Sequence, residues 1–248
     1  MAARRGDRGL TAAGVRAPRP GLAIALVVAL AAAGNAATNL LVPATLYVPA
    51  AGLVAALAVL VAVRVGGCGA RDLGLAAADL GAGLRLGVAA LAVVAALLAV
   101  GAALPATRAL LADRRVDEHS VAALLYATLV RIPLGTALLE ETLFRGVLLG
   151  LGLRRWPPPA AVAWSSALFG LWHVLPSVGL AGYNPAVAGL LQGPPGRLAV
   201  TTAAVAASAL AGVLLCWLRL RAGSLLAPAM LHVATNSLAY AAAWLVLS

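Results

Sequence analysis

The chain has 248 residues, of which 63% are hydrophobic and 10% are charged, and its mean hydropathy is +0.99. Water-soluble domains are about 45–50% apolar and about 25% charged, so this composition excludes an ordinary soluble protein and places the excess apolar residues against lipid. The net charge is +10, but all 18 basic residues are arginines that lie mostly in connectors between apolar runs, where a bilayer explains them. Nucleic-acid binding would need a basic helix or an aromatic–basic alternation, so we expect a lipid bilayer and no nucleic acid as partner. The absence of Lys and the abundance of Ala indicate a high-GC bacterial genome.

The first segment, residues 1–20, is rich in Gly, Ala and Pro and holds Arg4, Arg5, Arg8, Arg16 and Arg19. It has too little apolar surface to fold alone, so we predict a basic cytoplasmic tail. A cleaved signal peptide is the alternative, but the apolar run that follows continues to Leu41, which favours a spanning helix. Residues 21–119 and 120–248 then form an N-terminal and a C-terminal set of transmembrane helices.

Seven apolar stretches follow the tail, most of them with the roughly 20 residues that cross a hydrocarbon core of about 30 Å. We therefore predict an all-α fold, a polytopic transmembrane helical bundle of about seven spans. Between the second and third spans, Gly69–Leu80 is predicted as a short interfacial segment. The seven stretches are Gly21–Leu41, Ala44–Val63, Leu84–Leu104, Ser120–Leu153, Pro157–Leu175, Leu198–Leu218 and Ser224–Leu247.

The fourth stretch, Ser120–Leu153, is too long for one straight span, because it would form roughly 50 Å of helix. We expect it to tilt, to kink at Pro133 or to divide into two pieces.

The arginines also predict an orientation, because cytoplasmic connectors carry an excess of positive charge. With the N-terminus in the cytoplasm, the inner side holds the five tail arginines and Arg64, Arg71, Arg85, Arg154, Arg155, Arg219 and Arg221, against Arg108, Arg114, Arg115 and Arg197 outside. This predicts a multi-pass protein of the cell (inner) membrane whose seventh span ends outside. The Gly- and Pro-rich connector Pro176–Arg197 is expected simply to join two helices.

Only Glu140 and Glu141, of the eight acidic residues, fall inside an apolar stretch. One charge at the bilayer centre costs about 2.5–3.5 kcal/mol on insertion scales, so such groups need a partner or a water-filled cavity. Arg145 lies four residues after Glu141, in the favourable order for an ion pair on one helix face. Glu140 is turned about 100° away and stays free to act as a general base. The alternative is a buried ionic staple between helices, which leaves the second glutamate unexplained.

Two histidines repeat this pattern. His173 lies late in the fifth stretch, four residues after Phe169, and His232 lies in the seventh stretch, four residues before Asn236. A lone intramembrane histidine is often a packed residue bonded to a neighbouring carbonyl, but these polar groups on three helices satisfy one another only if they converge. His119, beside Glu118 in a loop, is expected to be solvated.

A carboxylate, two imidazoles, an amide and a guanidinium suit the hydrolysis of an amide bond. Glu140 would take a proton from water, and His173 would hold that water directly or through a metal ion. His232 and Asn236 would donate hydrogen bonds to the oxyanion. The sequence has no serine placed with a base and an acid as in a triad, and no His-Glu-x-x-His motif.

These motifs also carry a resemblance. Glu140-Glu141-x-x-x-Arg145, Phe169-x-x-x-His173 and His232-x-x-x-Asn236, in this order on separate apolar helices, resemble the CPBP family of CAAX-processing and bacteriocin-processing enzymes, also called Abi or type II CAAX prenyl endopeptidase-like proteins. The resemblance spans about Ser120–Tyr240; the first three helices are generic spans.

The resemblance implies an intramembrane endopeptidase with its catalytic core in residues 120–248, acting on a peptide or membrane protein. Glu140 would be the activating glutamate with Glu141, Arg145 and Phe169 in support, while His173 would act on the water and His232 with Asn236 on the oxyanion. The family is commonly labelled metalloprotease, although a metal-free glutamate mechanism is also argued for it. A divalent metal such as zinc would have Glu140, His173 and His232 as ligands, a chemically acceptable set.

Two other functions stay open at this point. One is a non-proteolytic scaffold or bacteriocin-immunity member of the same fold, which the intact motifs disfavour. The other is a transporter that uses the Glu and His residues as a proton relay, although the inverted repeats common in such proteins are not visible. Cys68 and Cys216 have no metal-like spacing and are expected to be small packing residues.

Overall fold

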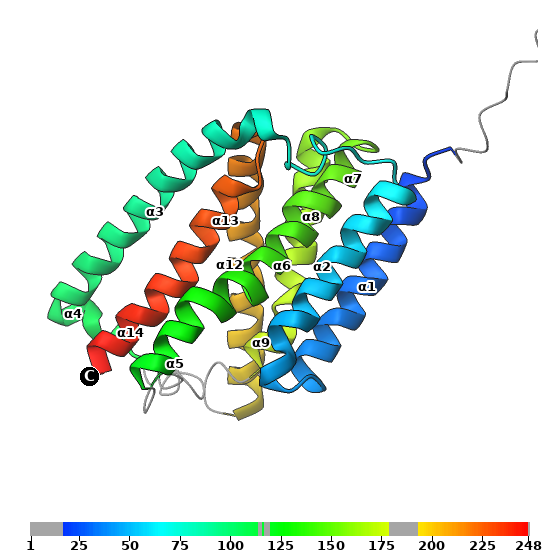
Figure 1. Cartoon of the computed structure of the whole chain (residues 1–248). Helices are drawn as coiled ribbons and strands as arrows, with labels where there is room; N and C mark the ends of the chain where they lie inside the picture. Colours follow the sequence, from blue (N-terminus) through cyan, green and yellow to red (C-terminus); the bar gives the residue numbers. More distant parts are fainter. Residues whose placement is uncertain (1–16, 114–115, 117–119, 179–192, 248) are drawn as a thin grey trace, which may run out of the picture.

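The computed structural model describes residues 17–113, 116, 120–178 and 193–247. Within these ranges the fold is a bundle of helices without strands, which confirms the predicted all-α class (Figure 1). The predicted tail up to residue 16, His119 and most of the connector Pro176–Arg197 lie outside the described residues.

The elements follow one another as α-helices, short 3-10 helices (η1, η2 and η3) and π-helical segments (η5, η6 and η7). In chain order they are α1 (Pro20–Leu40), η1 (Ala44–Leu46), α2 (Tyr47–Arg64), η2 (Ala77–Asp79), α3 (Leu80–Ala103), α4 (Pro105–Arg108), η3 (Ala109–Leu111), α5 (Val121–Tyr126), η5 (Ala127–Ala137), α6 (Leu138–Glu140), η6 (Glu141–Leu148), α7 (Leu149–Leu153), α8 (Pro158–Trp172), α9 (Val174–Ser177), α12 (Gly193–Ala222), α13 (Leu226–Val233), η7 (Ala234–Leu238) and α14 (Ala239–Leu247).

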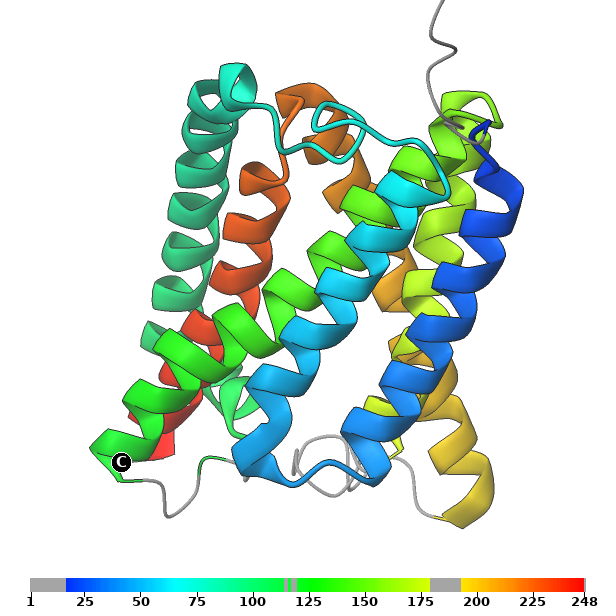
Figure 2. The same cartoon turned by 45° about the vertical axis from the view of Figure 1, so that its right-hand side comes forward.

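Six helical runs in the described part of the chain are long and apolar enough to cross a membrane, at 20–40, 44–64, 77–103, 121–153, 193–222 and 226–247. They agree with six of the seven predicted spans. The remaining stretch, Pro157–Leu175, forms α8 and α9, of 15 and 4 residues, which are separated at His173. Both lie within the bundle beside α12 (Figures 1 and 2), so the fifth predicted stretch is helical but is interrupted at His173.

The long fourth stretch does not divide. It runs from Val121 to Leu153 as one helical run, which crosses the bundle obliquely (Figure 2). Pro133, which has no N–H to donate, lies inside the π-helical segment η5, where the N–H of Leu138 bonds to the Pro133 carbonyl five residues back. The wider turns thus carry the chain past the proline without a break.

The centre of the bundle is formed by the second half of this run. Leu139, Leu143, Phe144 and Val147 are almost wholly buried, in the main core cluster that also takes residues from α1, α2, α8 and α12. The part of the run from residue 139 to 151, which carries Glu140 and Glu141, is therefore largely buried. α8 packs closely on α12 at Gly170, where an added Cβ would lie 2.7 Å from the Val205 carbonyl.

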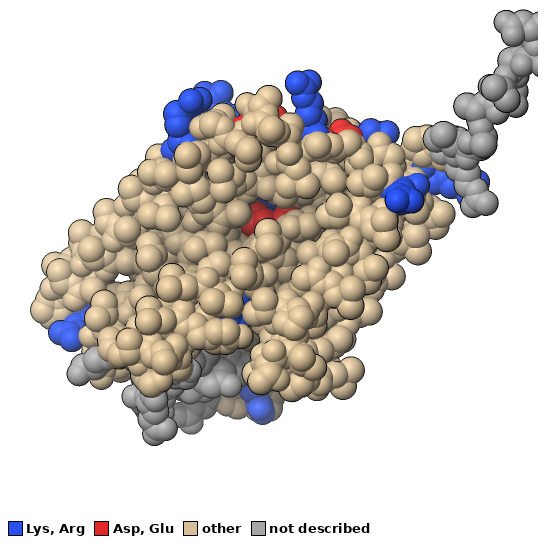
Figure 3. Space-filling view, viewed as in Figure 1, with Lys and Arg blue, Asp and Glu red and all other residues tan. Residues whose placement is uncertain are grey.

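One end of the bundle carries most of the described arginines, and Figure 3 shows them gathered at the end where α1 begins. The predicted interfacial segment Gly69–Leu80 caps this end. Leu73 is buried, Arg219 donates hydrogen bonds of 3.0 and 3.1 Å to the carbonyls of Arg71 and Asp72, and Asp72 pairs with Arg154 at 3.3 Å. Gly74 has a φ of +73° and its missing Cβ would collide with the Arg219 guanidinium, so only glycine fits there.

Candidate active site

The two adjacent glutamates are buried but differently partnered. Glu141 Oε1 accepts a hydrogen bond of 3.1 Å from Arg145 Nη1, the predicted i,i+4 ion pair. The same oxygen lies 2.7 Å from Nδ1 of His232. The Arg145 guanidinium in turn lies over the Phe169 ring, with Cζ 3.9 Å from the ring centroid. Glu141 Oε1 therefore belongs to a network that joins η6 to α13 and α8, whereas its Oε2 has no hydrogen-bond partner among the described residues.

Glu140 lies outside that ion pair. Its Oε1 accepts a hydrogen bond of 3.0 Å from the Trp172 indole Nε1. Its Oε2 lies 3.7 Å from Nε2 of His232 and 3.9 Å from Nε2 of His173, and has no hydrogen-bond partner among the described residues. These distances exceed a direct hydrogen bond. Oε2 of Glu140 therefore lies close to both imidazole nitrogens without a direct hydrogen bond to either of them.

The hydrogen bonds at the Nδ1 atoms determine what the two histidines present to Glu140 Oε2. His173 Nδ1 lies 2.8 Å from the backbone carbonyl of Phe169, which can only accept, so Nδ1 carries the proton and the Nε2 of a neutral ring presents its lone pair. His232 Nδ1 faces the Glu141 carboxylate in the same manner. With both rings neutral, two nitrogen lone pairs and the Glu140 Oε2 converge as three acceptors.

Phe169 organises the two imidazole rings. Its ring centroid is 4.7 Å from that of His173 and 6.1 Å from that of His232, both in edge-on arrangements. The Phe144 ring also contacts Phe169, with the two ring centroids 5.2 Å apart. Phe169 thus separates the Arg145 guanidinium from the imidazoles while holding both, which is a physical basis for its predicted supporting role.

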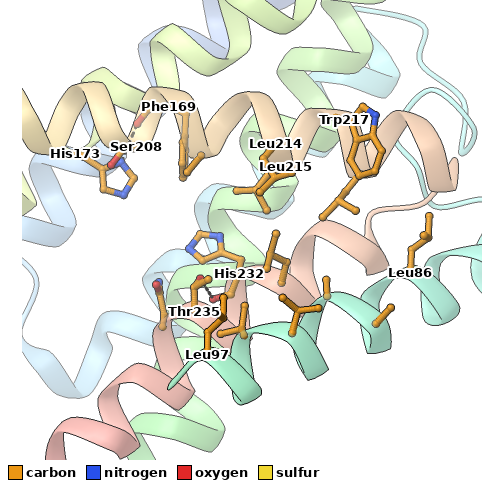
Figure 4. Close-up of a pocket in the computed structure, with 18 residues that line it drawn as sticks. Leu86, Leu97, Phe169, His173, Ser208, Leu214, Leu215, Trp217, His232 and Thr235 are labelled. Atoms are coloured by element: carbon orange, nitrogen blue, oxygen red, sulfur yellow. Dashed lines mark hydrogen bonds between the residues drawn. The ribbon is translucent and has the colours of Figure 1, made fainter. Parts of the chain in front are cut away.

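An apolar pocket of about 620 Å³ begins at the histidines. Figure 4 shows His173 towards one end, His232 near the middle, and Trp217 and Leu86 towards the other end. Its walls come from α3, α12, α13 and η7, and Asn236, the last predicted catalytic residue, lines it beside Thr235. The His173 side chain is 25% exposed and that of His232 only 6%, so His173 is the more accessible from this pocket.

The predicted metal ligands Glu140, His173 and His232 lie slightly too far apart for a preformed zinc site. Two ligands of one tetrahedral zinc ion lie about 3.4 Å apart, and the separations here are a few tenths of an ångström wider. No group of three or more His, Cys, Asp and Glu side chains in the described ranges is close enough for a preformed metal centre. The donor types fit nevertheless, and each imidazole has its Nδ1 bound to an oxygen, the usual arrangement behind a metal-ligating Nε2.

The structure thus brings together Glu140, Glu141, Arg145, His173 and His232, with Phe169 between them and Asn236 in the adjoining pocket. Two further participants are not evident from the motifs. Trp172 donates to Glu140, and Asn35 of α1 donates to the Trp172 carbonyl at 2.9 Å. An Asn inside an apolar span is a signal for a polar contact, whereas a Trp in such a helix is usually a packing residue.

The comparisons with known proteins agree with these motifs. The family model described as type II CAAX prenyl endopeptidase Rce1-like matches residues 122–238, close to the segment that carries the resemblance. No curated protein and no solved structure matches the chain. The matched segment contains every predicted site residue, and the bundle around it is built from helices that can span a membrane. Residues 122–238 are thus similar to the Rce1-like family of type II CAAX prenyl endopeptidases, and the chain is a multi-pass membrane protein.

Proposed function

We propose that the protein is an intramembrane endopeptidase in which Glu140 activates a water molecule for attack on a peptide bond. The observation that supports this most strongly is the pairing of a buried, unpartnered carboxylate oxygen with two imidazole nitrogens at 3.7 and 3.9 Å. Burying these polar groups in an apolar bundle costs free energy, and ionisable residues inside membrane spans usually mark functional sites. One water molecule between these atoms would satisfy Oε2.

In this proposal Glu140 Oε2 takes the proton of the water as its oxygen attacks the substrate carbonyl. The indole N–H of Trp172 holds the other carboxylate oxygen and so aims Oε2 at the water. His173 receives a hydrogen bond from the water at Nε2, because its own proton is held at Nδ1 by the Phe169 carbonyl. The proton taken by Glu140 then passes to the leaving amine.

His232 and Asn236 are proposed to stabilise the oxyanion. His232 can donate from Nε2 only when its ring carries both protons, and the Glu141 carboxylate at 2.7 Å from Nδ1 stabilises that cation. Arg145 holds Glu141 in place. The Asn236 amide would donate from the pocket side, where a substrate carbonyl enters.

A divalent metal ion is the second way to satisfy three converging acceptors. Glu140, His173 and His232 would hold it, and a bound ion would supply Lewis-acid polarisation of the water or the carbonyl. Metal analysis of the purified protein, together with activity before and after chelation, separates this variant of the mechanism from the metal-free one.

The substrate is proposed to be a peptide or membrane protein with a large apolar group beside the scissile bond. The pocket that begins at His173 is lined otherwise almost wholly by apolar side chains, among them Leu97, Leu214 and Trp217. The arginines are in excess at the end of the bundle where α1 begins, and cytoplasmic ends carry such an excess. The protein is therefore proposed to lie in the inner membrane with its N-terminus in the cytoplasm.

The experiment is cleavage of quenched fluorescent peptides by the purified full chain in liposomes. A farnesylated C-a-a-X peptide, the substrate type that the family name describes, is compared with its unlipidated counterpart. Wild type should cleave at least one of them, and Glu140→Gln should lower the rate by about 10³-fold or more. Asp79→Asn, the same acid-to-amide change outside the site, is the matched control. Equal rates in wild type and Glu140→Gln, or none in either, would favour a non-proteolytic member of the family.

A further inference from the structure

The N-terminal helix α1 lies outside the matched family segment 122–238, yet it contacts the candidate active site. Asn35 is 8% exposed, and its Nδ2 donates a hydrogen bond of 2.9 Å to the backbone carbonyl of Trp172. Trp172 is the last residue of α8 and lies directly before His173. A residue of the generic N-terminal spans thus touches the junction that carries two site side chains.

The sequence explains why that carbonyl needs a partner from another helix. In an uninterrupted helix the Trp172 carbonyl would accept from the N–H of residue 176, but this residue is Pro176, which has no N–H. The proline ring also clashes with the carbonyl four residues before it, and the helix breaks at His173, with φ −82° and ψ 1°. A buried carbonyl without a donor is strongly unfavourable, and the Asn35 amide provides that donor.

Neighbouring contacts fix the direction of the Asn35 amide. Asn39, one turn later on α1, donates from Nδ2 to Asn35 Oδ1 at 2.7 Å, so the Asn35 oxygen faces Asn39 and its nitrogen faces Trp172. α1 itself is held close to α2, because an added Cβ at Gly34 would lie 3.0 Å from a Val54 methyl group. The donor is therefore presented from a rigid position.

We propose that Asn35 is a positioning residue of the active site, which acts through Trp172. By holding the Trp172 carbonyl at the helix break, it sets the indole whose N–H bonds to Glu140 Oε1. The resulting chain runs from Asn39 through Asn35 and Trp172 to Glu140, and ends at the Oε2 atom that faces the histidines. This inference rests on the proposed endopeptidase function.

The test is a kinetic double-mutant cycle in liposomes with whichever of the two peptides described above the wild type cleaves. Asn35→Leu removes the amide and should lower kcat about tenfold, in line with one buried hydrogen bond, while KM stays within about twofold, because Asn35 does not line the pocket. Trp172→Phe keeps the ring packing and removes the indole donor, and should lower kcat about 30-fold. Because both changes act through one chain of contacts, the double variant should lie within about twofold of Trp172→Phe alone.

Thr38→Val is the matched control on the same helix, since the Thr38 hydroxyl bonds only to carbonyls of α1 itself, and should stay within about twofold of wild type. The inference is overturned if Asn35→Leu has the kcat of wild type, or if the two losses multiply to about 300-fold. Should Asn35→Leu not yield monodisperse protein, Asn35→Ser, whose short hydroxyl does not reach α8, takes its place with the same expected outcomes. Failure of the proposed function would differ: wild type would show no Glu140-dependent cleavage, and the positioning role would fall with it.

Discussion

Two of the helical runs that carry candidate catalytic side chains each contain a proline, and the proline has a different outcome in each. The run 121–153 passes Pro133 without a break, because its turns widen into a π-helix, and both glutamates on it are buried. The helix that would join α8 and α9 breaks at His173, directly before α9 (Val174–Ser177). It breaks there because Pro176 leaves the Trp172 carbonyl without its usual donor. Proline thus leaves the carboxylates on a continuous helix and places one histidine at a break.

The carboxylate half of the site (the run 121–153) and its histidine half (α8 and α9) therefore owe their geometry to different contacts. Glu141 is fixed by Arg145 on its own helix, whereas His173 and Trp172 depend on hydrogen bonds that a helix break made available, one of them from α1. The carboxylate half should therefore respond to loss of its buried charges, and the histidine half to changes in the break.

The largest effect is expected for Glu141→Gln, which tests the carboxylate half. It leaves the Arg145 guanidinium, which is buried and otherwise lies on Phe169, without a counter-charge, and it weakens the bond to His232. Removing one partner of a buried pair costs about 3–5 kcal/mol. Thermal unfolding in detergent should show a marked loss of stability together with loss of activity. An unchanged melting curve would mean that the ion pair contributes little.

The next effect compares the two prolines directly. Pro176→Ala restores an N–H opposite the Trp172 carbonyl, so we expect the helix to continue through His173 and the imidazole to leave the Phe169 carbonyl. Cleavage should fall by about 10- to 100-fold with stability kept or raised. Pro133→Ala is the matched control and should stay within about threefold. If both variants behave alike, the break does not position His173.

A smaller effect is expected for Phe169→Leu, which removes the aromatic face shared by the two halves. Loss of the cation–π contact and of ring packing should lower stability by about 1–2 kcal/mol and cleavage by a modest factor. Chemical unfolding followed by far-UV circular dichroism measures the first quantity. A Phe169→Leu variant more stable than wild type would contradict the supporting role.

The smallest effect is expected in the cap loop between α2 and η2, outside both halves. Cys68 is 4% exposed, and burial, with Asp72 nearby, raises the pKa of its thiol above the ordinary value. A raised pKa lowers the thiolate fraction at neutral pH, so maleimide labelling at pH 7 should be slow and should accelerate as the pH rises. Cys68→Ser should leave cleavage unchanged. Rapid labelling of the folded protein at pH 7 would show that the cap is open.

The sequence was sufficient for much of this arrangement, because charges inside apolar stretches are expensive. Five polar residues inside apolar stretches could be identified one by one: Glu140, Glu141, Arg145, His173 and His232. The i,i+4 spacing also predicted the ion pair of Glu141 with Arg145. The bond between His232 and Glu141 was not predictable, since it depends on how α13 packs against η6. The break at His173 was missed because the hydropathy of Pro157–Leu175 is continuous, although Pro176 marks its end. Asn35 was missed because its helix carries no motif.

The central claim is that Glu140 Oε2 and the two Nε2 atoms hold one small group between them. The most direct measurement is an experimental structure of the full chain at a resolution that shows ordered water. The account predicts density within about 3.2 Å of all three atoms, as a water molecule or an ion. An apolar side chain at that point, or a Glu140 carboxylate turned away from both imidazoles, would contradict it.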